Sequence, residues 1–109
     1  MATTWDEILA FALTLPDTVE STSYGTPAAK VRGRLFLRSR PEDDAVVVLC
    51  TPWEKEALLQ SGDPAMFTTP HYDGHPYILL KLSEAALDAE IEELLTEAWR
   101  IGEGQAKRP

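Results

Sequence analysis

The stretch AAKVRGRLFLRSRPEDDAVVVLC, residues 28–50, decides the fold. It contains three runs that are suited to strands: Ala28–Arg32, Leu35–Arg40 and Ala45–Cys50. Gly33-Arg34 is the expected first turn and residues 41–44 are the second, and connections this short join antiparallel neighbours. The last run, AVVVLC, is almost entirely apolar, which is typical of a strand buried on both faces. The stretch therefore predicts the centre of an antiparallel sheet.

Helical patterns occur near both ends of the chain. Thr4 and Glu7 have the spacing of a capping box, and apolar residues then recur at helical intervals until Pro16 ends the helix. Toward the other end, Ser83 is the expected cap of a helix with an apolar stripe, and Gly102 is its expected C-terminal cap. The stripes indicate that both helices pack on the sheet.

Shorter elements lie between these parts. Thr51-Pro52 has the pattern of a helix start, and Gly62 has the pattern of its end. Residues 77–82 predict a fourth strand and residues 68–71 a further extended segment, whereas the polar segment 17–27 predicts a loop. The order α-β-β-β-α-β-α predicts an α+β fold of two layers, an antiparallel sheet covered on one face by the N- and C-terminal helices.

Length and composition indicate one domain over residues 1–109. The chain is 44% hydrophobic and 26% charged, as ordinary soluble proteins are. No apolar run approaches the roughly 20 residues that span a bilayer, and the acidic N-terminus is unlike a signal peptide, so we expect a cytoplasmic protein with no membrane partner. The single cysteine, Cys50, excludes an internal disulfide and is expected in the core. Residues 105–109 are expected to fray.

Half of the positive charge lies in residues 30–40. This run sums to +5, whereas the rest of the chain sums to −13. A local basic surface on an acidic protein is suited to an anion. The candidate anion-binding residues are Lys30, Arg32, Arg34, Arg38 and Arg40. They could instead form a solvated face paired with acids such as Glu42, Asp43, Asp44 or those of the last helix. The hairpin register decides whether Lys30, Arg32, Arg38 and Arg40 share one face, because a one-residue slip moves every side chain to the other face.

Four segments carry a resemblance to known proteins: LTLP at 13–16, SYGTPAAKVRGRLF at 23–36, TPHYDGHPYILLKL at 69–82 and EAWR at 97–100. In this order they resemble the MmcQ/YjbR family of small bacterial proteins over nearly the whole chain. The resemblance implies a fold similar to that of frataxin (CyaY), in which the two terminal helices cover a twisted antiparallel sheet. It also implies DNA binding, the common label of the family, and it supplies no catalytic residues.

The loop before the basic strands contains a candidate shared site. Ser23, Tyr24 and Gly25 offer two hydroxyls and a permissive backbone that could cradle an anion, and His71 from the other long segment is the fourth member. The alternative is a structured loop in which Gly25 supplies an unusual backbone angle and Tyr24 packs on the sheet. The structured loop is the simpler interpretation.

The segment HYDGHP, residues 71–76, does not predict a metal site. Its glycine and proline break the helical spacing that would bring two imidazoles to one metal, so we expect no metal and no cofactor. No serine or cysteine has a base at a recognised spacing, so we expect no catalytic residue. An enzyme that uses Glu20, Tyr24 and His71 is the third hypothesis.

These observations predict a non-enzymatic binding module. The first hypothesis is DNA binding through the basic hairpin, with about four or five phosphate contacts and a salt slope near −4. The second is a protein- or small-anion-interaction domain with no nucleic-acid role, in which the basic strip meets an acidic protein partner or another copy of the chain. We expect a monomer or a weak homodimer.

Overall fold

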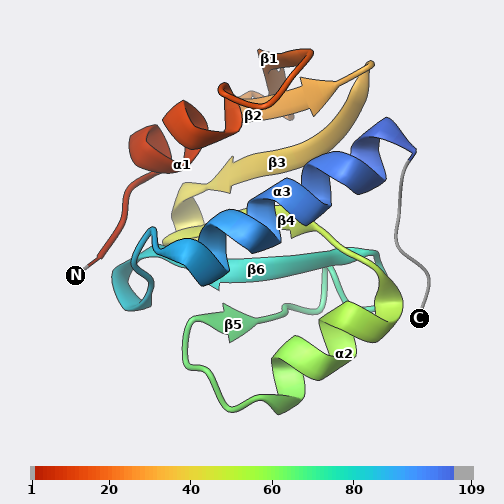
Figure 1. Cartoon of the computed structure of the whole chain (residues 1–109). Helices are drawn as coiled ribbons and strands as arrows, with labels where there is room; N and C mark the ends of the chain where they lie inside the picture. Colours follow the sequence, from red (N-terminus) through yellow and green to blue (C-terminus); the bar gives the residue numbers. More distant parts are fainter. Residues whose placement is uncertain (1, 105–109) are drawn as a thin grey trace.

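Six strands form one antiparallel sheet in the order β1-β2-β3-β4-β6-β5, and three helices pack against it (Figure 1). The computed structural model describes residues 2–104. The strands are β1 (Thr18–Ser23), β2 (Thr26–Val31), β3 (Arg34–Arg40), β4 (Ala45–Leu49), β5 (Met66–Phe67) and β6 (Tyr77–Lys81). The helices are α1 (Trp5–Ala12), α2 (Pro52–Gln60) and α3 (Ala89–Glu103), with short 3₁₀ turns η1 (Pro41–Asp43) and η2 (Leu82–Glu84).

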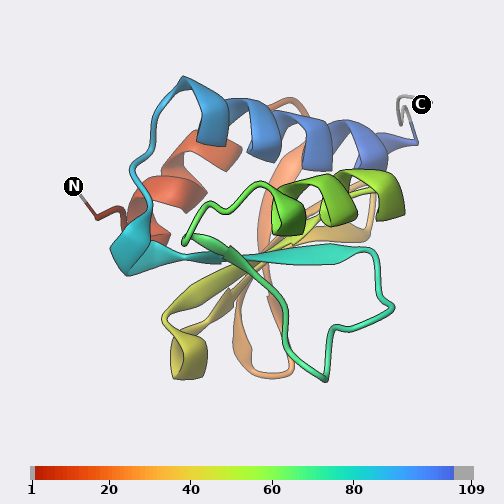
Figure 2. The same cartoon turned by 90° about the horizontal axis from the view of Figure 1, so that it is seen from below.

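The helices lie on one side of the sheet, and the β1–β2 turn, η1 and the loop of residues 68–76 lie on the other (Figure 2). The helical side holds the main core, in which Ile8 of α1 and Leu95 of α3 are buried with Val48 of β4. The opposite side, which we term the open face, holds a smaller cluster around Val47. The predicted α+β fold is confirmed, and so is the burial of the third strand of the opening stretch on both faces.

A β-bulge in β3 sets which side chains reach the open face. Consecutive residues of β2 pair with Leu37 and Leu35, so that Phe36 is an extra residue in β3. Phe36 and Leu37 both enter the main core. The alternation then resumes with Arg38, which lies opposite Val47 on the open face. The bulge therefore fixes the register that the sequence left undetermined.

The predicted loop over residues 17–27 is wrong, because this segment contains β1 and the start of β2. β1 has the sequence TVESTS and is half-buried or exposed along its whole length, as an edge strand can be. It therefore lacks the alternation of apolar and polar residues that predicts a strand. Its pairing with β2 runs from Thr18 opposite Val31 to Ser23 opposite Thr26.

Two-residue turns connect β1 to β2 and β2 to β3. Tyr24-Gly25 forms the first and Arg32-Gly33 the second, and in both turns φ is +52° and then +79°. Positive φ at both central residues is typical of the type I′ turn, which matches the twist of the paired strands. The predicted turn at Gly33-Arg34 is therefore wrong by one residue, and Arg34 begins β3.

The two terminal helices begin or end away from the predicted positions. α1 stops at Ala12 and the backbone then turns before Pro16. α3 starts only after Asp88, whose side chain accepts a hydrogen bond from the backbone amide of Ile91. The predicted cap, Ser83, lies in η2. Asp and Ser are caps of similar strength, so the sequence did not distinguish the two positions.

The C-terminal cap of α3 is Gly104, with φ of +91°, and not Gly102. Gly102 lies inside the helix, where an added Cβ would be 2.6 Å from Cγ1 of Val31. Its role is therefore close packing of the helix on the sheet. The predicted extended segment 68–71 is also displaced, since the short strand there is β5. The predicted fraying of residues 105–109 lies outside the described residues.

No helix within residues 2–104 combines the length and the apolar character that crossing a membrane requires.

Candidate functional site

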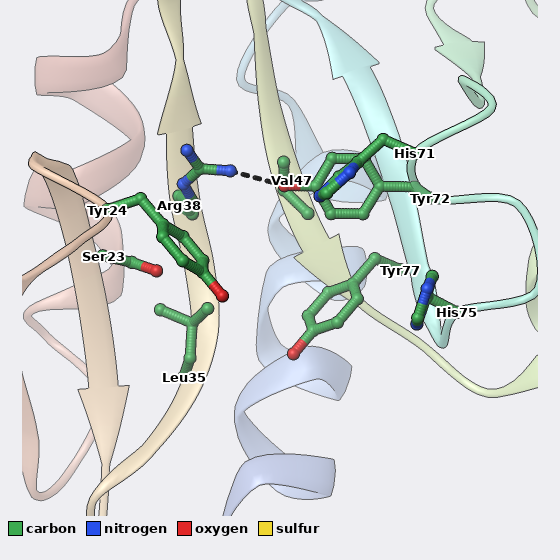
Figure 3. A pocket seen from close by; sticks show the side chains of 9 residues that line it. All are labelled: Ser23, Tyr24, Leu35, Arg38, Val47, His71, Tyr72, His75 and Tyr77. Carbon is green, nitrogen blue, oxygen red and sulfur yellow. Dashed lines mark hydrogen bonds between the residues drawn. The ribbon is translucent and has the colours of Figure 1, made fainter.

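A pocket of about 370 Å³ opens on the open face, between the β1–β2 turn and the loop 68–76 (Figure 3). Nine residues line this open-face pocket: Ser23, Tyr24, Leu35, Arg38, Val47, His71, Tyr72, His75 and Tyr77. Five of the nine carry aromatic rings, and none is acidic. β3 and β4 contribute Leu35, Arg38 and Val47, and the two flanking loops contribute most of the rest.

Arg38 carries the permanent positive charge of this pocket. Its side chain is only 7% exposed. Nε donates to the hydroxyl of Thr26 at 3.0 Å, and Nη1 donates to the hydroxyl of Tyr72 at 2.5 Å. Both acceptors are hydroxyl groups, and the ion pairs formed within residues 2–104 do not include Arg38. A guanidinium removed from water without a counter-ion is costly, so the pocket is electrostatically suited to an anion.

Tyr72 forms the opposite wall and is held from two sides. Its hydroxyl accepts from Arg38, and its backbone carbonyl accepts from Nζ of Lys55 at 2.7 Å. Lys55 is a buried residue of α2, and it also donates to the carbonyl of His75 at 2.9 Å. The ring of Tyr72 meets the ring of His71 edge-on, with centroids 4.7 Å apart. The lysine therefore fixes the loop that carries three lining residues.

Tyr24 stands at the mouth of the pocket. Its side chain is 91% exposed, so the predicted packing of Tyr24 on the sheet is wrong. The guanidinium carbon of Arg38 lies 5.4 Å from the centre of its ring, a cation–π distance. The type I′ turn that carries Tyr24 favours Asn, Asp or Gly at this position. Turn chemistry alone therefore does not account for a tyrosine here.

Tyr77 completes the wall beyond Tyr72, and the two rings meet edge-on with centroids 6.0 Å apart. Burial raises the pKa of the Tyr77 hydroxyl, and the positive charge of nearby Arg34 partly opposes this effect. The hydroxyl is therefore protonated at neutral pH and can donate a hydrogen bond to a ligand.

The five predicted anion-binding residues fall into different surroundings. Arg38 and Arg40 share the open face with Lys30, which lies opposite Leu35. Arg32 and Arg34 lie at the end of the β2–β3 hairpin, both exposed. The Arg32 side chain is 65% exposed, and its Nε is 4.0 Å from a Glu103 carboxylate oxygen. The anion-binding role of the five residues stays a prediction.

Arg40 differs from Arg38 in having carboxylate partners. Its Nε donates to Asp43 at 2.5 Å, and its Nη1 lies 3.6 Å from Glu42. The hydrogen bond to Asp43 raises the pKa of Arg40. Its guanidinium carbon also lies 5.3 Å from the centre of the Tyr72 ring, and Arg40 is not among the residues that line the open-face pocket. Arg40 is thus neutralised locally, as the alternative of a paired face predicted.

Three members of the predicted shared site meet in the structure. Ser23, Tyr24 and His71 all line the open-face pocket, whereas Gly25, the fourth member, serves the turn. Glu20, which only the enzyme hypothesis named, is in β1 and does not line the pocket. The sequence did not single out Arg38 as their common neighbour. It also missed the contribution of three pocket residues: Tyr72, His75 and Tyr77. The one available signal was the concentration of rings in HYDGHPY, next to a segment that carried the resemblance.

Cys50 follows β4 directly and is buried in the main core, as predicted. Burial raises the pKa of its thiol to about 12, with a smaller contribution from Glu54. A thiol with this pKa is not a nucleophile at neutral pH.

Comparison with known proteins gives the family. A family model described as YjbR matches residues 13–101. The chain is 31% identical over 111 residues to "Uncharacterized protein Rv2570" of Mycobacterium tuberculosis (strain ATCC 25618 / H37Rv), a match that covers 88% of this chain and 85% of the relative. "Uncharacterized protein Mb2600" of Mycobacterium bovis (strain ATCC BAA-935 / AF2122/97) matches equally. The chain therefore belongs to the YjbR family, as the resemblance predicted.

Proposed function

For this member of the YjbR family, we propose a non-enzymatic binding function in which a small organic anion occupies the open-face pocket and pairs with Arg38. The observation that carries the proposal is the burial of Arg38 without a carboxylate partner among the described residues. A buried arginine is expected to have an anion beside it. Because the pocket lining contains no acid, a ligand is the natural source of that anion.

The position of Arg38 favours a small ligand over a nucleic acid at this site. Phosphates of a duplex are contacted by exposed side chains that project from the protein surface. Arg38 is instead recessed on β3, between Thr26 and Tyr72. A group that enters a pocket of about 370 Å³ can reach it, since pockets near this size hold small molecules.

An NMR titration of the ¹⁵N-labelled protein with acetate, benzoate and inorganic phosphate tests this function. We expect at least one anion to shift the backbone amides of Ser23, His71 and Tyr72, with saturation. Arg38→Gln should abolish the shifts, and Arg32→Gln, which removes an exposed arginine outside the pocket, should leave them unchanged. The wild-type shifts locate binding even if Arg38→Gln folds poorly. If none of the three anions moves the pocket amides at millimolar concentration, the proposal is wrong.

DNA binding is the second candidate, and one observation favours it. Arg32 and Arg34 are exposed at the end of the β2–β3 hairpin, and Lys30 is half-exposed on β2, two residues before Arg32. Since Arg38 is recessed and Arg40 is paired, we count three available cations in place of five. Three phosphate contacts correspond to a salt slope of about −2.7, or about 40-fold weaker binding at 200 mM than at 50 mM salt.

Fluorescence anisotropy of a labelled 20-base-pair duplex measures this slope. The double variant Arg32→Ala/Arg34→Ala should remove most of the binding and flatten the slope. Arg38→Gln should change neither the duplex affinity nor the slope. The same set of variants therefore distinguishes the two candidate functions. No binding of the duplex at 50 mM salt would exclude this candidate.

A further inference from the structure

We infer that the ligand of the open-face pocket is an aromatic monocarboxylic acid, whose carboxylate pairs with Arg38 and whose ring lies between Tyr24 and Tyr77. The inference rests on the proposed function, because it concerns the same pocket, and it adds the chemical class of the ligand. Charge, donor geometry and ring content support it separately.

The charge of the pocket matches one negative charge. Arg38 is the one permanently charged residue among the nine that line it. A phosphate dianion would be under-compensated there, in a protein whose net charge is −8. Phosphate sites also use backbone amides at helix N-termini or in glycine-rich nests, whereas this pocket is lined from strands and loops. A carboxylate, with a single charge, is the better match.

Arg38 keeps enough N–H donors for a carboxylate. Of its five N–H groups, one on Nε and one on Nη1 are engaged within residues 2–104. Two N–H groups on Nη2 and one on Nη1 are left to bind a ligand, enough for a bidentate contact. Because Thr26 and Tyr72 hold opposite ends of the guanidinium, its plane is fixed before the ligand arrives. Such preorganisation reduces the entropy lost on binding.

The walls of the pocket are suited to a flat ring. Figure 3 shows Tyr24 on one side and Tyr72 and Tyr77 on the other, with Leu35 of β3 on the side of Tyr24 and Val47 of β4 next to Tyr72. Aromatic pairs in edge-on or offset arrangements gain free energy beyond that of the apolar area they bury. A volume of about 370 Å³ lies near the lower end for small-molecule sites, which fits an acid with one or two rings.

A second, independent observation is the conformation of Tyr24. The residue is 91% exposed and has a φ of +52°, which is uncommon for a tyrosine. An exposed ring in an unfavourable backbone conformation contributes little to folding. It gains a role if a ligand ring covers it, because the ligand then buries the face that solvent now touches.

Isothermal titration calorimetry with matched probes tests the ligand class. The probes are benzoate, 2-naphthoate, cyclohexanecarboxylate, benzamide and inorganic phosphate. We expect benzoate and 2-naphthoate to bind at least threefold more tightly than cyclohexanecarboxylate, which has the charge without the aromatic ring. Benzamide, which has the ring without the charge, should bind at least tenfold more weakly than benzoate. Phosphate should also bind more weakly than benzoate.

Substitutions of Tyr24 sharpen the test, because the residue is exposed and its change should not unfold the protein. Tyr24→Leu should lower the ratio of benzoate to cyclohexanecarboxylate affinity, because Tyr77 alone then remains beside the ligand ring, while the affinity for cyclohexanecarboxylate should stay unchanged. Tyr24→Phe should keep the wild-type ratio. A ratio that Tyr24→Leu leaves at its wild-type value would overturn the role of the ring.

The failures of the two proposals are distinguishable. If cyclohexanecarboxylate or phosphate binds as tightly as benzoate, the aromatic class is wrong and the anion-binding function stands. If no anion binds the wild-type protein, both are wrong.

Discussion

The two type I′ turns of the sheet have the same backbone and different surroundings. Tyr24-Gly25 faces the loop 68–76 across the open-face pocket, and its tyrosine lies over Arg38. Arg32-Gly33 lies at the far end of β2, where the Arg32 side chain approaches Glu103 at 4.0 Å. One turn is a wall of a pocket, and the other is a surface turn with a weak ion pair.

This difference separates what the backbone requires from what a site requires. Both turns need positive φ at two residues, and both provide a glycine at the second position. Neither provides the Asn, Asp or Gly that the first position favours. A side chain that departs from the turn preference can therefore mark a function or only a tolerated substitution. The environment of each turn decides which applies, and three predictions test this.

The largest effect is expected from Lys55→Met. This substitution removes the loop clamp, by which we mean the two hydrogen bonds from Lys55 to the loop that faces Tyr24. The variant loses two hydrogen bonds from a buried ammonium to backbone carbonyls, and we expect the free energy of unfolding to fall by about 3 kcal/mol. Urea denaturation measures the change. Lys30→Met, at a half-exposed position near the other turn, should change it by less than about 0.5 kcal/mol. Equal effects of the two substitutions would contradict a special role of the loop clamp.

An intermediate effect is expected from Gly25→Ala and Gly33→Ala. Both glycines have φ of +79°, and an added Cβ would meet no atom within 4 Å at either position. The penalty is therefore conformational and should be similar in the two variants, about 1 to 2 kcal/mol. Thermal and urea unfolding measure it. Only Gly25→Ala should also weaken benzoate binding, since it shifts the turn that carries Tyr24.

The same two turns show what the sequence could and could not predict. The antiparallel strands of residues 28–50 were predicted because Val46, Val47 and Val48 form an apolar run next to turn residues. β1 was missed because its pairing is a property of backbone groups, whereas its side chains are polar. Each turn was misplaced or unrecognised because neither tyrosine nor arginine signals a type I′ turn.

The candidate site was predicted only in part, for a related reason. Resemblance indicated Ser23, Tyr24 and His71 together, but their common neighbour is a residue of the basic run. The bulge at Phe36 determines that Arg38 points into the pocket. The local sequence contains no pattern that predicts a bulge at this position. The contact between Arg38 and Tyr72 also joins residues 34 positions apart, beyond the reach of any motif.

The smallest effect is expected from placing asparagine at the first position of each turn. Arg32→Asn should raise the free energy of unfolding by about 0.5 to 1 kcal/mol, because asparagine adopts positive φ more readily. The 4.0 Å contact to Glu103, in which the Arg32 side chain is 65% exposed, offsets only a small part of this gain. Tyr24→Asn gains the same stabilisation of the turn backbone, but it loses the cation–π contact with Arg38. That contact is worth about 0.5 to 1 kcal/mol.

The net change for Tyr24→Asn should therefore be close to zero, and the difference between the two variants measures the contact between Tyr24 and Arg38. Urea titrations with equal m-values for both variants resolve a difference of this size when they are run in parallel. If both variants gain the same stability, the ring contributes nothing to the fold. Its presence would then have to be explained by what it binds, so loss of benzoate binding in Tyr24→Asn alone would assign the tyrosine entirely to the ligand.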